Sequence, residues 1–464
     1  MNKSSSKNSS TNPLAVVILA AGQGTRMKSE RPKVMHELAG LPMIQWVIRT
    51  AEELDPEKII VVAGPGMPEL LQAVKPHQAV IQEIRNGTVG ALKVALSALK
   101  NFKGDVLVLA GDVPLITKAT LQKLIRARSE KPIYGLAVLG AEMCDPTGYG
   151  RLITSKDGTL KKIVEHKDAT DEEREIKLVN TGAWCIESLR LGAWINQVKN
   201  KNTAQEYYLT DLPQVAAKDH VPTAVAVADC AQEVQGCNSR AEMAALERAL
   251  QQRLREKTME GGVTMIDPAT VTLHFDTVIG KDVVIEPNVF FGPGVEVAPQ
   301  AVIRGFSHIE GAKIGKGAVI GPFARLRPGA EIGAEARIGN FVEIKQSKIG
   351  RHSKINHLAY VGDTMMGDDV NFSAGAITVN YDGFEKHKTI IGKGVMIGSN
   401  VNLVAPVTIN DGAFIAAGST ITENVSANAL AIERDTAEIR KGWAAEYRRK
   451  KESLVKKLGK KKKK

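Results

Sequence analysis

The chain has 464 residues, more than one hydrophobic core usually serves, so two or three domains are expected. Its formal net charge of +11 is concentrated in residues 440–464, which hold 13 Lys and Arg against 2 Glu. The rest is neutral overall, which excludes a broad basic face for nucleic acid, and no run of 18 apolar residues predicts a membrane span.

Residues 1–13 are rich in Ser, Asn and Lys, and we predict that they are disordered. They lack the apolar core of a signal peptide. From residue 14 to about 237, short apolar strands alternate with helical stretches, a pattern that predicts an α/β domain with a parallel sheet flanked by helices. The cysteines show no metal-ligand or C-x-x-C spacing, so free thiols and a cytoplasmic location are expected.

A glycine-rich loop, LAAGQGTRM, follows the first predicted strand at residues 19–27. Ligands of open α/β sheets bind at the carboxyl ends of strands, and Gly22 and Gly24 let backbone N–H groups approach phosphate oxygens. The loop matches neither G-x-G-x-x-G nor a P-loop, which excludes a dinucleotide site and a Walker ATPase. Arg26 and Lys33 are placed to neutralise a triphosphate during phosphoryl transfer.

A later buried strand ends at Asp112 in the sequence AGD. Mg²⁺ prefers hard oxygen ligands and needs few protein donors when substrate phosphates also bind it. Asp112 is therefore a candidate ligand, although a strand-end Asp considered alone is more often a turn residue.

Residues 238–260 predict a connecting helix, because they are rich in helix formers, contain no Gly or Pro, and end before Gly261 and Gly262.

Residues 261–439 are predicted to form a third region, in which a six-residue beat of apolar residues runs from Ile279 to Ile421 with Gly, Asn, Asp or Pro beside most of them. A helix would space apolar residues by three or four and a hairpin sheet by two, so this period predicts a β-solenoid. Three hexads per turn give about 18 residues per coil and about eight coils. The anchors of the beat are Ile279, Ile285, Phe291, Val297, Ile303, Ile309, Ile314, Ile320, Leu326, Ile332, Ile338, Ile344, Ile349, Ile355, Val361, Met366, Phe372, Thr378, Ile391, Ile397, Leu403, Ile409, Ile415 and Ile421.

Polar residues concentrate in one stretch of this solenoid, and the beat breaks at residues 380–388, which predicts an insertion that leaves the coils. An amine that attacks a thioester must lose a proton, and a neutral imidazole such as His357 is a suitable base. Glu343 lies near enough in coil register to orient His357. The alternatives are a hydrogen-bonded surface histidine and a solenoid that serves only as a scaffold or trimerisation rod.

The string L-A-A-G-x-G-T-R-M with P-K resembles the signature of sugar-1-phosphate nucleotidylyltransferases. The beat is similar to that of hexapeptide-repeat acyltransferases, which coil as a left-handed parallel β-helix. Together, over residues 14–443, they resemble the bifunctional N-acetylglucosamine-1-phosphate uridylyltransferase/glucosamine-1-phosphate N-acetyltransferase family of bacterial cell-wall precursor synthesis.

This resemblance implies a Rossmann-like nucleotidyltransferase domain, a linker helix and a left-handed parallel β-helix. It implies acetyl transfer from acetyl-CoA to glucosamine-1-phosphate, then reaction of the product with UTP and Mg²⁺ to give UDP-N-acetylglucosamine and pyrophosphate. It also implies a cytoplasmic homotrimer with no obligate nucleic-acid partner. The alternative is a nucleotidylyltransferase alone, with a non-catalytic trimerising β-helix.

In the first site the resemblance implies catalytic roles for Arg26 and Lys33, and Mg²⁺ ligation by Asp112 and Asn238. The implied nucleotide-sugar contacts are Leu19, Ala20, Ala21, Gly22, Lys33, Gln82, Gly87, Thr88, Ala110, Gly111, Asp112, Gly150, Glu165, Asn180 and Asn238. Two departures touch this pocket: Ala110 stands where the family often has Tyr, and the loop at residues 82–91 reads QEIRNGTVGA.

In the second site the resemblance implies that His357 is the catalytic base. The implied sugar-phosphate contacts are Arg327, Lys345, Tyr360, Asn371 and Lys386. The implied acetyl-CoA contacts are Ala374, Asn380, Tyr381, Ser399, Ala417 and Arg434.

The basic tail at residues 440–464 is expected to be solvated and disordered, and the alternative is a segment that binds nucleic acid or anionic lipid.

Overall fold

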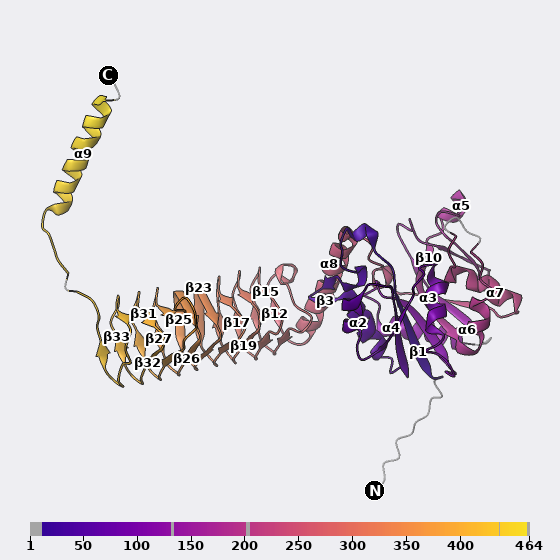
Figure 1. Ribbon diagram of the computed structural model, residues 1–464, viewed down its shortest axis with the longest axis horizontal. Helices are drawn as coiled ribbons and strands as arrows, with labels where there is room; N and C mark the ends of the chain where they lie inside the picture. The colour runs from indigo at the N-terminus through magenta and orange to yellow at the C-terminus, as the bar shows by residue number, and fades with distance from the viewer. Residues whose placement is uncertain (1–11, 131–133, 201–204, 436, 462–464) are drawn as a thin grey trace, which may run out of the picture. The chain divides into compact units, whose positions relative to one another are not determined.

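The computed structural model describes residues 12–130, 134–200, 205–435 and 437–461. The expected disordered N-terminus, residues 1–13, therefore lies outside the described residues except for Asn12 and Pro13. The chain divides into two compact units: residues up to Glu260 with Thr272–Thr277, and Gly261–Val271 with Val278–Lys464 (Figure 1).

The first unit is built on a sheet with the strand order β11-β7-β10-β6-β1-β4-β5. These strands are β1 (Leu14–Ala20), β4 (Lys58–Ala63), β5 (Gln78–Ile81), β6 (Asp105–Ala110), β7 (Leu136–Glu142), β10 (Leu178–Glu187) and β11 (Thr223–Val227). Strand β1 is parallel to β4 and β6, and β4 is parallel to β5, as predicted. The expected parallel sheet contains one exception among these strands, β10, which is antiparallel to both β6 and β7. The antiparallel strands β8 (Arg151–Thr154) and β9 (Leu160–Val164) pair beside it, and β2 (Glu37–Leu38) pairs with β3 (Leu41–Pro42).

Alternation along β1 separates two cores, one on each face of the sheet. Val16, Ile18 and Ala20 belong to one buried cluster, whereas Ala15 and Val17 belong to the other. Helices cover both faces (Figure 1). These helices are α1 (Met43–Glu52), α2 (Pro68–Ala73), α3 (Thr88–Ala95), α4 (Lys118–Ser129), α6 (Ser188–Ile195) and α7 (Leu212–Lys218), whereas the short α5 (Asp171–Arg174) has no buried residue. A sheet buried on both faces leaves its strand ends as the place for a ligand.

The predicted linker helix is α8 (Arg240–Glu260). The first unit also takes in residues 272–277, which the sequence analysis assigns to the solenoid. Leu273 is held to the first unit because the Gln251 side chain of α8 bonds both of its backbone groups. Gln251 Nε2 donates to the Leu273 carbonyl (2.7 Å), and Gln251 Oε1 accepts from the Leu273 N–H (2.9 Å).

The second unit is a coil of parallel strands with three faces. The first face holds β12 (Thr264–Met265), β14 (Val284–Ile285), β17 (Val302–Ile303), β20 (Val319–Ile320), β23 (Arg337–Lys345), β25 (Lys354–Gly362), β27 (Asn371–Phe372), β30 (Met396–Ile397), β33 (Phe414–Ile415) and β35 (Leu430–Ala431). The second holds β13 (Val278–Ile279), β16 (Glu296–Val297), β19 (Ala312–Ile314), β22 (Ala330–Ile332), β24 (Ser347–Ile349), β26 (Thr364–Met366), β29 (Thr389–Ile391) and β32 (Val407–Ile409). The third holds β15 (Phe290–Phe291), β18 (His308–Ile309), β21 (Arg325–Leu326), the later parts of β23 and β25, β28 (Ile377–Val379), β31 (Asn402–Val404) and β34 (Thr420–Ile421).

The predicted anchors form the core of this β-helix, because every one of them except Ile279 is buried. Parallel register stacks them coil on coil, for example Ile285 on Ile303 and Ile303 on Ile320. Within the expected bounds of residues 261–439, the strands extend beyond the first and last anchors, because β12 precedes Ile279 and β35 follows Ile421.

The predicted insertion at residues 380–388 does leave the coils. Tyr381 and Lys386 form an antiparallel bridge inside it, while Met366 still pairs with Ile391 across it. The insertion therefore adds a loop without interrupting the stack.

The basic tail contains helix α9 (Trp443–Lys461), so the expectation of a disordered tail is wrong over this range. Local pairs support the helix: the Trp443 and Tyr447 rings stack at 5.1 Å, and Glu446 pairs with Lys450 at 3.0 Å. Within the described part of the chain, every helix is too short or too polar to cross a bilayer.

Two candidate active sites

The first unit contains a cavity of about 570 Å³ at the carboxyl ends of β1 and β6. Most of the residues expected to bind the nucleotide line it: Leu19, Ala20, Ala21, Gly22, Lys33, Gln82, Gly87, Thr88, Ala110, Asp112, Glu165 and Asn180. Its position follows from the parallel pairing of β1 with β6, which brings the glycine-rich loop and the AGD sequence to the same edge of the sheet.

Four expected residues do not line this cavity, and three of them are Arg26, Gly111 and Gly150. Arg26 lies in a short 3₁₀ helix, Thr25–Met27, and its side chain is exposed. Gly111 donates its N–H to the Leu19 carbonyl (2.9 Å), so it ties the two strand ends together. Gly150 accepts from the Asn180 N–H at 2.8 Å and so supports a lining residue from behind.

Asn238, the fourth expected residue outside the lining, reaches the site through Lys33. The Lys33 ammonium donates to Asn238 Oδ1 (3.1 Å) and also to Asp112 Oδ2. An ammonium thus lies between the carboxylate and amide oxygens that were expected to hold Mg²⁺, which shows that these two oxygens converge on one cation. Hard oxygen donors of this kind fit Mg²⁺ when substrate phosphates complete its shell. The described residues contain no cluster of three or more His, Cys, Asp or Glu side chains that could hold a metal.

Glu165 is a carboxylate of the cavity wall, and burial raises its pKa, although a hydrogen bond from Thr210 opposes the shift. A carboxylate in this position can accept hydrogen bonds from sugar hydroxyl groups. Gly150 lies directly beside it, because a Cβ at residue 150 would meet Glu165 Oε1 at 3.4 Å.

Sequence reasoning missed part of the wall, namely Val34, Arg85, Ala91, Gly182, Trp184, Glu206, Tyr208, Leu209 and Thr210. Residues 206–210 follow no predicted strand and carry no motif, and they reach the cavity through the backbone pairing of Tyr207 with Asn86 (2.9 Å) and Val89 (3.0 Å). Arg85 could have been suspected from the sequence, because it lies in the loop at residues 82–91 that departs from the family pattern. Its Nε donates to the Ala21 carbonyl at 2.8 Å.

In the second unit, His357 lies on the first face of the β-helix, in a cavity of about 310 Å³ that Asn340, Asn356 and Arg337 also line. Parallel register places Asn340 directly opposite His357, and His357 Nδ1 lies 2.9 Å from Asn340 Oδ1. The structure therefore supplies a different partner from the expected Glu343.

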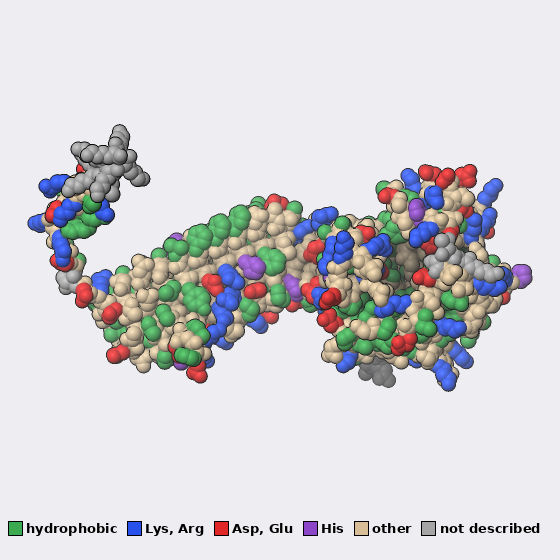
Figure 2. Space-filling view, turned by 45° about the horizontal axis from the view of Figure 1, so that its top comes forward, with side chains coloured by type: hydrophobic (Ala, Val, Ile, Leu, Met, Phe, Trp, Pro, Cys, Tyr) green, Lys and Arg blue, Asp and Glu red, His purple; other side chains and the backbone are tan. Residues whose placement is uncertain are grey.

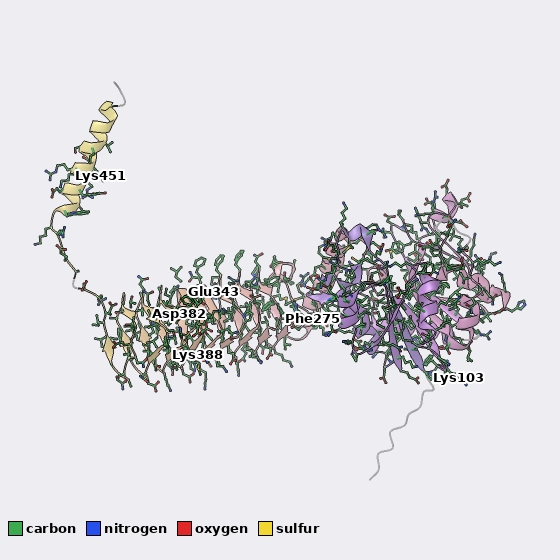
Figure 3. All side chains as sticks on the ribbon, in the orientation of Figure 1. Lys103, Phe275, Glu343, Asp382, Lys388 and Lys451 are labelled. Carbon is green, nitrogen blue, oxygen red and sulfur yellow. The ribbon has the colours of Figure 1, made fainter. Side chains whose placement is uncertain are left out.

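Glu343 lies opposite Tyr360, one corner of the coil away from His357. The corner is Phe341, whose φ is 55°. Glu343 Oε1 accepts from Arg327 Nη1 at 2.8 Å, and Arg325 lies 3.6 Å from the other oxygen. The six-residue spacing predicts that Glu343 and His357 lie on neighbouring coils. The strand register shows in addition that a corner of the coil separates their side chains. Figure 3 marks Glu343 on the β-helix, with Asp382 and Lys388 of the insertion.

Around that corner, the side-chain nitrogen atoms of Lys345 and Lys386 come together. The hydrogen bond with Lys386 lowers the pKa of Lys345, and partial desolvation and the nearby Arg327 act in the same direction. Tyr360 joins this cluster through its hydroxyl, which lies 3.5 Å from Asn380 Nδ2. Asp363 acts in the opposite direction on the pKa of Lys345. Convergent basic side chains of this kind are suited to binding a phosphate.

The residues expected to contact acetyl-CoA form a column along successive coils. Asn400 donates its N–H to the Ala374 carbonyl (2.9 Å), and Gly418 donates to the Ser399 carbonyl (2.8 Å), so Ala374, Ser399 and Ala417 occupy equivalent corners. Arg434 ends the column, with its Nη1 donating to the Ala417 carbonyl at 2.7 Å. The exposed Tyr381 ring stands in the insertion, where its hydroxyl donates to Gly383 O (2.6 Å).

Asn371 is also expected to bind the sugar phosphate, but within one chain it lies in a different cavity from His357. It lines a basin of about 720 Å³ with Arg337 and Lys354, and it does not line the His357 cavity. Figure 2 shows blue and purple side chains, which are Lys, Arg and His, gathered along the β-helix.

Comparisons with known proteins cover both units. Residues 16–256 match the model of the MobA-like NTP transferase domain, and residues 311–346 and 388–423 match that of the bacterial transferase hexapeptide (six repeats). Parallel strands built from hexapeptide repeats agree with the expected left-handed β-helix, so the predicted fold class is confirmed.

The chain is also similar over nearly its full length to curated bacterial proteins. It is 49% identical to the Bifunctional protein GlmU of Paramagnetospirillum magneticum over 435 residues, which cover 94% of this chain and 96% of that protein. It is 50% identical to the Bifunctional protein GlmU of Rhodospirillum rubrum, with 94% and 97% covered. The protein of the same name from Zymomonas mobilis is 47% identical over 443 residues, with 95% and 98% covered.

Proposed function

The chain belongs to the family of bifunctional GlmU proteins, and from that premise we propose that it makes UDP-N-acetylglucosamine in two steps. The β-helix transfers an acetyl group from acetyl-CoA to the amine of glucosamine-1-phosphate. The first unit then joins N-acetylglucosamine-1-phosphate to the uridylyl group of UTP and releases pyrophosphate.

In the acetyl transfer, His357 is the general base that takes a proton from the substrate amine as it attacks the thioester. Asn340 accepts a hydrogen bond from Nδ1, so the lone pair lies on Nε2. The phosphate lies on the cations of Arg327, Lys345 and Lys386, with Tyr360 and Asn371 completing the binding set. The column of Ala374, Ser399 and Ala417, with Asn380, Tyr381 and Arg434, contacts acetyl-CoA. The guanidinium of Arg434 is permanently charged and suits a phosphate of the coenzyme.

In the uridylyl transfer, the glycine-rich loop and the residues around Gln82 and Thr88 hold the nucleotide, while Glu165 and Asn180 face the sugar. Asp112 and Asn238 would hold Mg²⁺, which supplies positive charge at the phosphates when it is bound. Lys33 adds a second cation at the same place, and Arg26 lies on the open side of the loop. These charges stabilise the developing negative charge as the sugar phosphate attacks and pyrophosphate leaves.

We further propose a homotrimer in the cytoplasm. Asn371 and His357 line adjoining cavities that share Arg337, and both cavities are open, so a neighbouring β-helix would close a site that uses both residues. The thiols of Cys144, Cys185, Cys230 and Cys237 are all free, as they are in reducing compartments.

The observation that carries the two-step function is that two separate clusters, one around Asp112 and one around His357, occur in a chain that matches a bifunctional relative over 94% of its length. An inert β-helix would need neither the lysine pair nor the Asn340–His357 contact.

Product analysis by chromatography tests this function, with the purified chain, glucosamine-1-phosphate, acetyl-CoA, UTP and Mg²⁺, omitting one component at a time. We expect UDP-N-acetylglucosamine only when every component is present. His357→Ala should abolish CoA release but leave pyrophosphate release from pre-acetylated sugar phosphate. Loss of both activities in a folded His357→Ala protein contradicts two independent sites, and pyrophosphate formation without any CoA release by the unmodified chain leaves only the nucleotidylyltransferase.

A further inference from the structure

Helix α9 takes no part in either proposed site, and its side chains are fully available. Every residue of α9 from Trp443 to Val455, the part whose side chains the structure describes, is exposed. The described residues of the preceding segment, 432–442, are also exposed and form neither helix nor strand. The helix therefore follows an exposed segment, whose residues Glu433 and Arg434 are hydrogen-bonded to Ser419 and Ala417 of the last coils.

One face of α9 is apolar. Trp443, Tyr447 and Leu454 are spaced by four and seven residues, which returns them to the same side of an α-helix. All three are large and about half exposed, at 53%, 46% and 53%. The Trp443 and Tyr447 rings stack at 5.1 Å with an interplanar angle of 14°, so they form one continuous aromatic surface. Exposure of a contiguous apolar surface to water is unfavourable, and such surfaces commonly mark a site that binds a protein or a membrane.

The rest of the helix is strongly cationic. Arg448, Arg449, Lys450 and Lys451 follow one another, and one of the two acidic residues, Glu446, is paired with Lys450 at 3.0 Å. Lys451 Nζ lies 5.6 Å from the Tyr447 ring centre, so a cation borders the aromatic surface. Residues 440–464 together hold 13 basic and 2 acidic residues, and the rest of the chain is neutral overall.

We propose that α9 is an interfacial helix that binds the surface of an anionic lipid bilayer. An amphipathic helix with Lys and Arg on its polar side and Trp or Leu on the other lies in the headgroup region, with its apolar face toward the acyl chains. Aromatic rings such as those of Trp443 and Tyr447 favour this boundary, and each basic residue gains from the negative surface potential.

The apolar face of α9 favours a bilayer over a nucleic acid as the partner. A nucleic acid would satisfy the cations but would leave Leu454 and Val455, 53% and 68% exposed, in water. A bilayer satisfies both the charge and the apolar face. Binding there would hold the enzyme at the membrane surface through its tail while leaving both active sites free.

The test is co-sedimentation of the full-length protein with phosphatidylcholine vesicles that contain or lack phosphatidylglycerol. We expect binding to the mixed vesicles, weak binding to pure phosphatidylcholine, and a blue shift of tryptophan emission on binding. Trp443 is the source of the shift, because Trp184 and Trp194 are only 1% exposed. The difference spectrum against Trp443→Phe isolates its signal from that of Trp46.

Two double variants separate the contribution of the apolar face of α9 from that of its positive charge. Trp443→Ser with Leu454→Ser keeps the charge and should weaken binding by on the order of tenfold or more. Arg448→Gln with Arg449→Gln should weaken binding to a similar extent and reduce its salt dependence. The matched control is Lys313→Gln with Lys348→Gln, which removes the same charge from the β-helix, where these lysines pair with Glu296 and Glu331. It should bind vesicles like the unmodified chain.

Three outcomes overturn the proposal. One is the absence of vesicle binding. Another is no change in Trp443 emission, or undiminished binding by the Trp443→Ser, Leu454→Ser protein, since either result means that the apolar face does not enter the bilayer. The third is tighter binding to single- or double-stranded RNA than to the mixed vesicles at equal salt, which identifies a nucleic-acid tail. CoA and pyrophosphate release by each variant confirm that it is folded.

Discussion

His357 Nδ1 and Asn340 Oδ1 lie 2.9 Å apart, on adjacent coils of the β-helix. An amide oxygen can only accept a hydrogen bond, so this contact requires the proton to be on Nδ1. Nε2 then carries the lone pair and can act as a base. The tautomer of the proposed catalytic histidine is thus set by a neutral residue rather than by a carboxylate.

Asn340→Ala should reduce the kcat of acetyl transfer by roughly tenfold, which is less than the loss of about 100-fold or more expected for His357→Ala. Asn340→Asp should move the acid limb of the pH–rate profile to higher pH, because a carboxylate stabilises the protonated imidazolium, which is inactive as a base. Stopped-assay CoA release across pH measures both. An unchanged profile for Asn340→Asp would remove Asn340 from its positioning role.

Glu343→Gln distinguishes the observed contact from the one expected from the sequence. Because Glu343 holds Arg327 at 2.8 Å, its loss should raise the KM for glucosamine-1-phosphate by about five- to tenfold and leave the acid limb in place. Steady-state kinetics over a range of pH gives both quantities. A shift of the acid limb with KM unchanged would instead restore Glu343 as the partner of His357.

Lys386→Ala tests the lysine pair. The pKa of Lys345 is lowered chiefly by its hydrogen bond with Lys386, so Lys345 loses its proton at a lower pH than an ordinary lysine. The KM for glucosamine-1-phosphate should therefore rise as pH increases through this lowered pKa, because the neutral amine no longer attracts phosphate. In Lys386→Ala this rise should move to higher pH, while the KM at neutral pH increases by on the order of tenfold.

Lys348→Ala is the matched control for Lys386→Ala, since Lys348 pairs with Glu331 on another face of the β-helix. It should change neither the KM nor its pH dependence. If Lys386→Ala behaves like Lys348→Ala, the phosphate does not lie on the lysine pair.

Asp112→Ala should reduce uridylyl transfer by at least about 100-fold and raise the Mg²⁺ concentration needed for half-maximal rate. Asn238→Ala should raise that concentration less, because an amide oxygen carries no formal charge. Pyrophosphate release titrated with Mg²⁺ measures both, and CoA release should be unchanged. An unaltered Mg²⁺ requirement in Asp112→Ala would place the metal elsewhere.

Much of the first site could be predicted because its residues sit at strand ends. Leu19 to Gly22 and Asp112 follow buried strands, and parallel pairing brings such ends together whatever the loops do. Glu206 and Thr210 could not be found in this way, since they reach the cavity through loop contacts formed only in the folded chain. The antiparallel direction of β10 had no local signature either.

The β-helix follows from the chain's own pattern, because burial requires an apolar residue at each inward position and the six-residue spacing records those positions one by one. The residue types available for the chemistry can be read from the same pattern. Their neighbours depend on how the coils stack in the folded chain. Phe341 turns the coil between Asn340 and Glu343, so hydrogen-bond register, which acts between segments 17 residues apart, selected Asn340 for His357 and left Glu343 to Arg327.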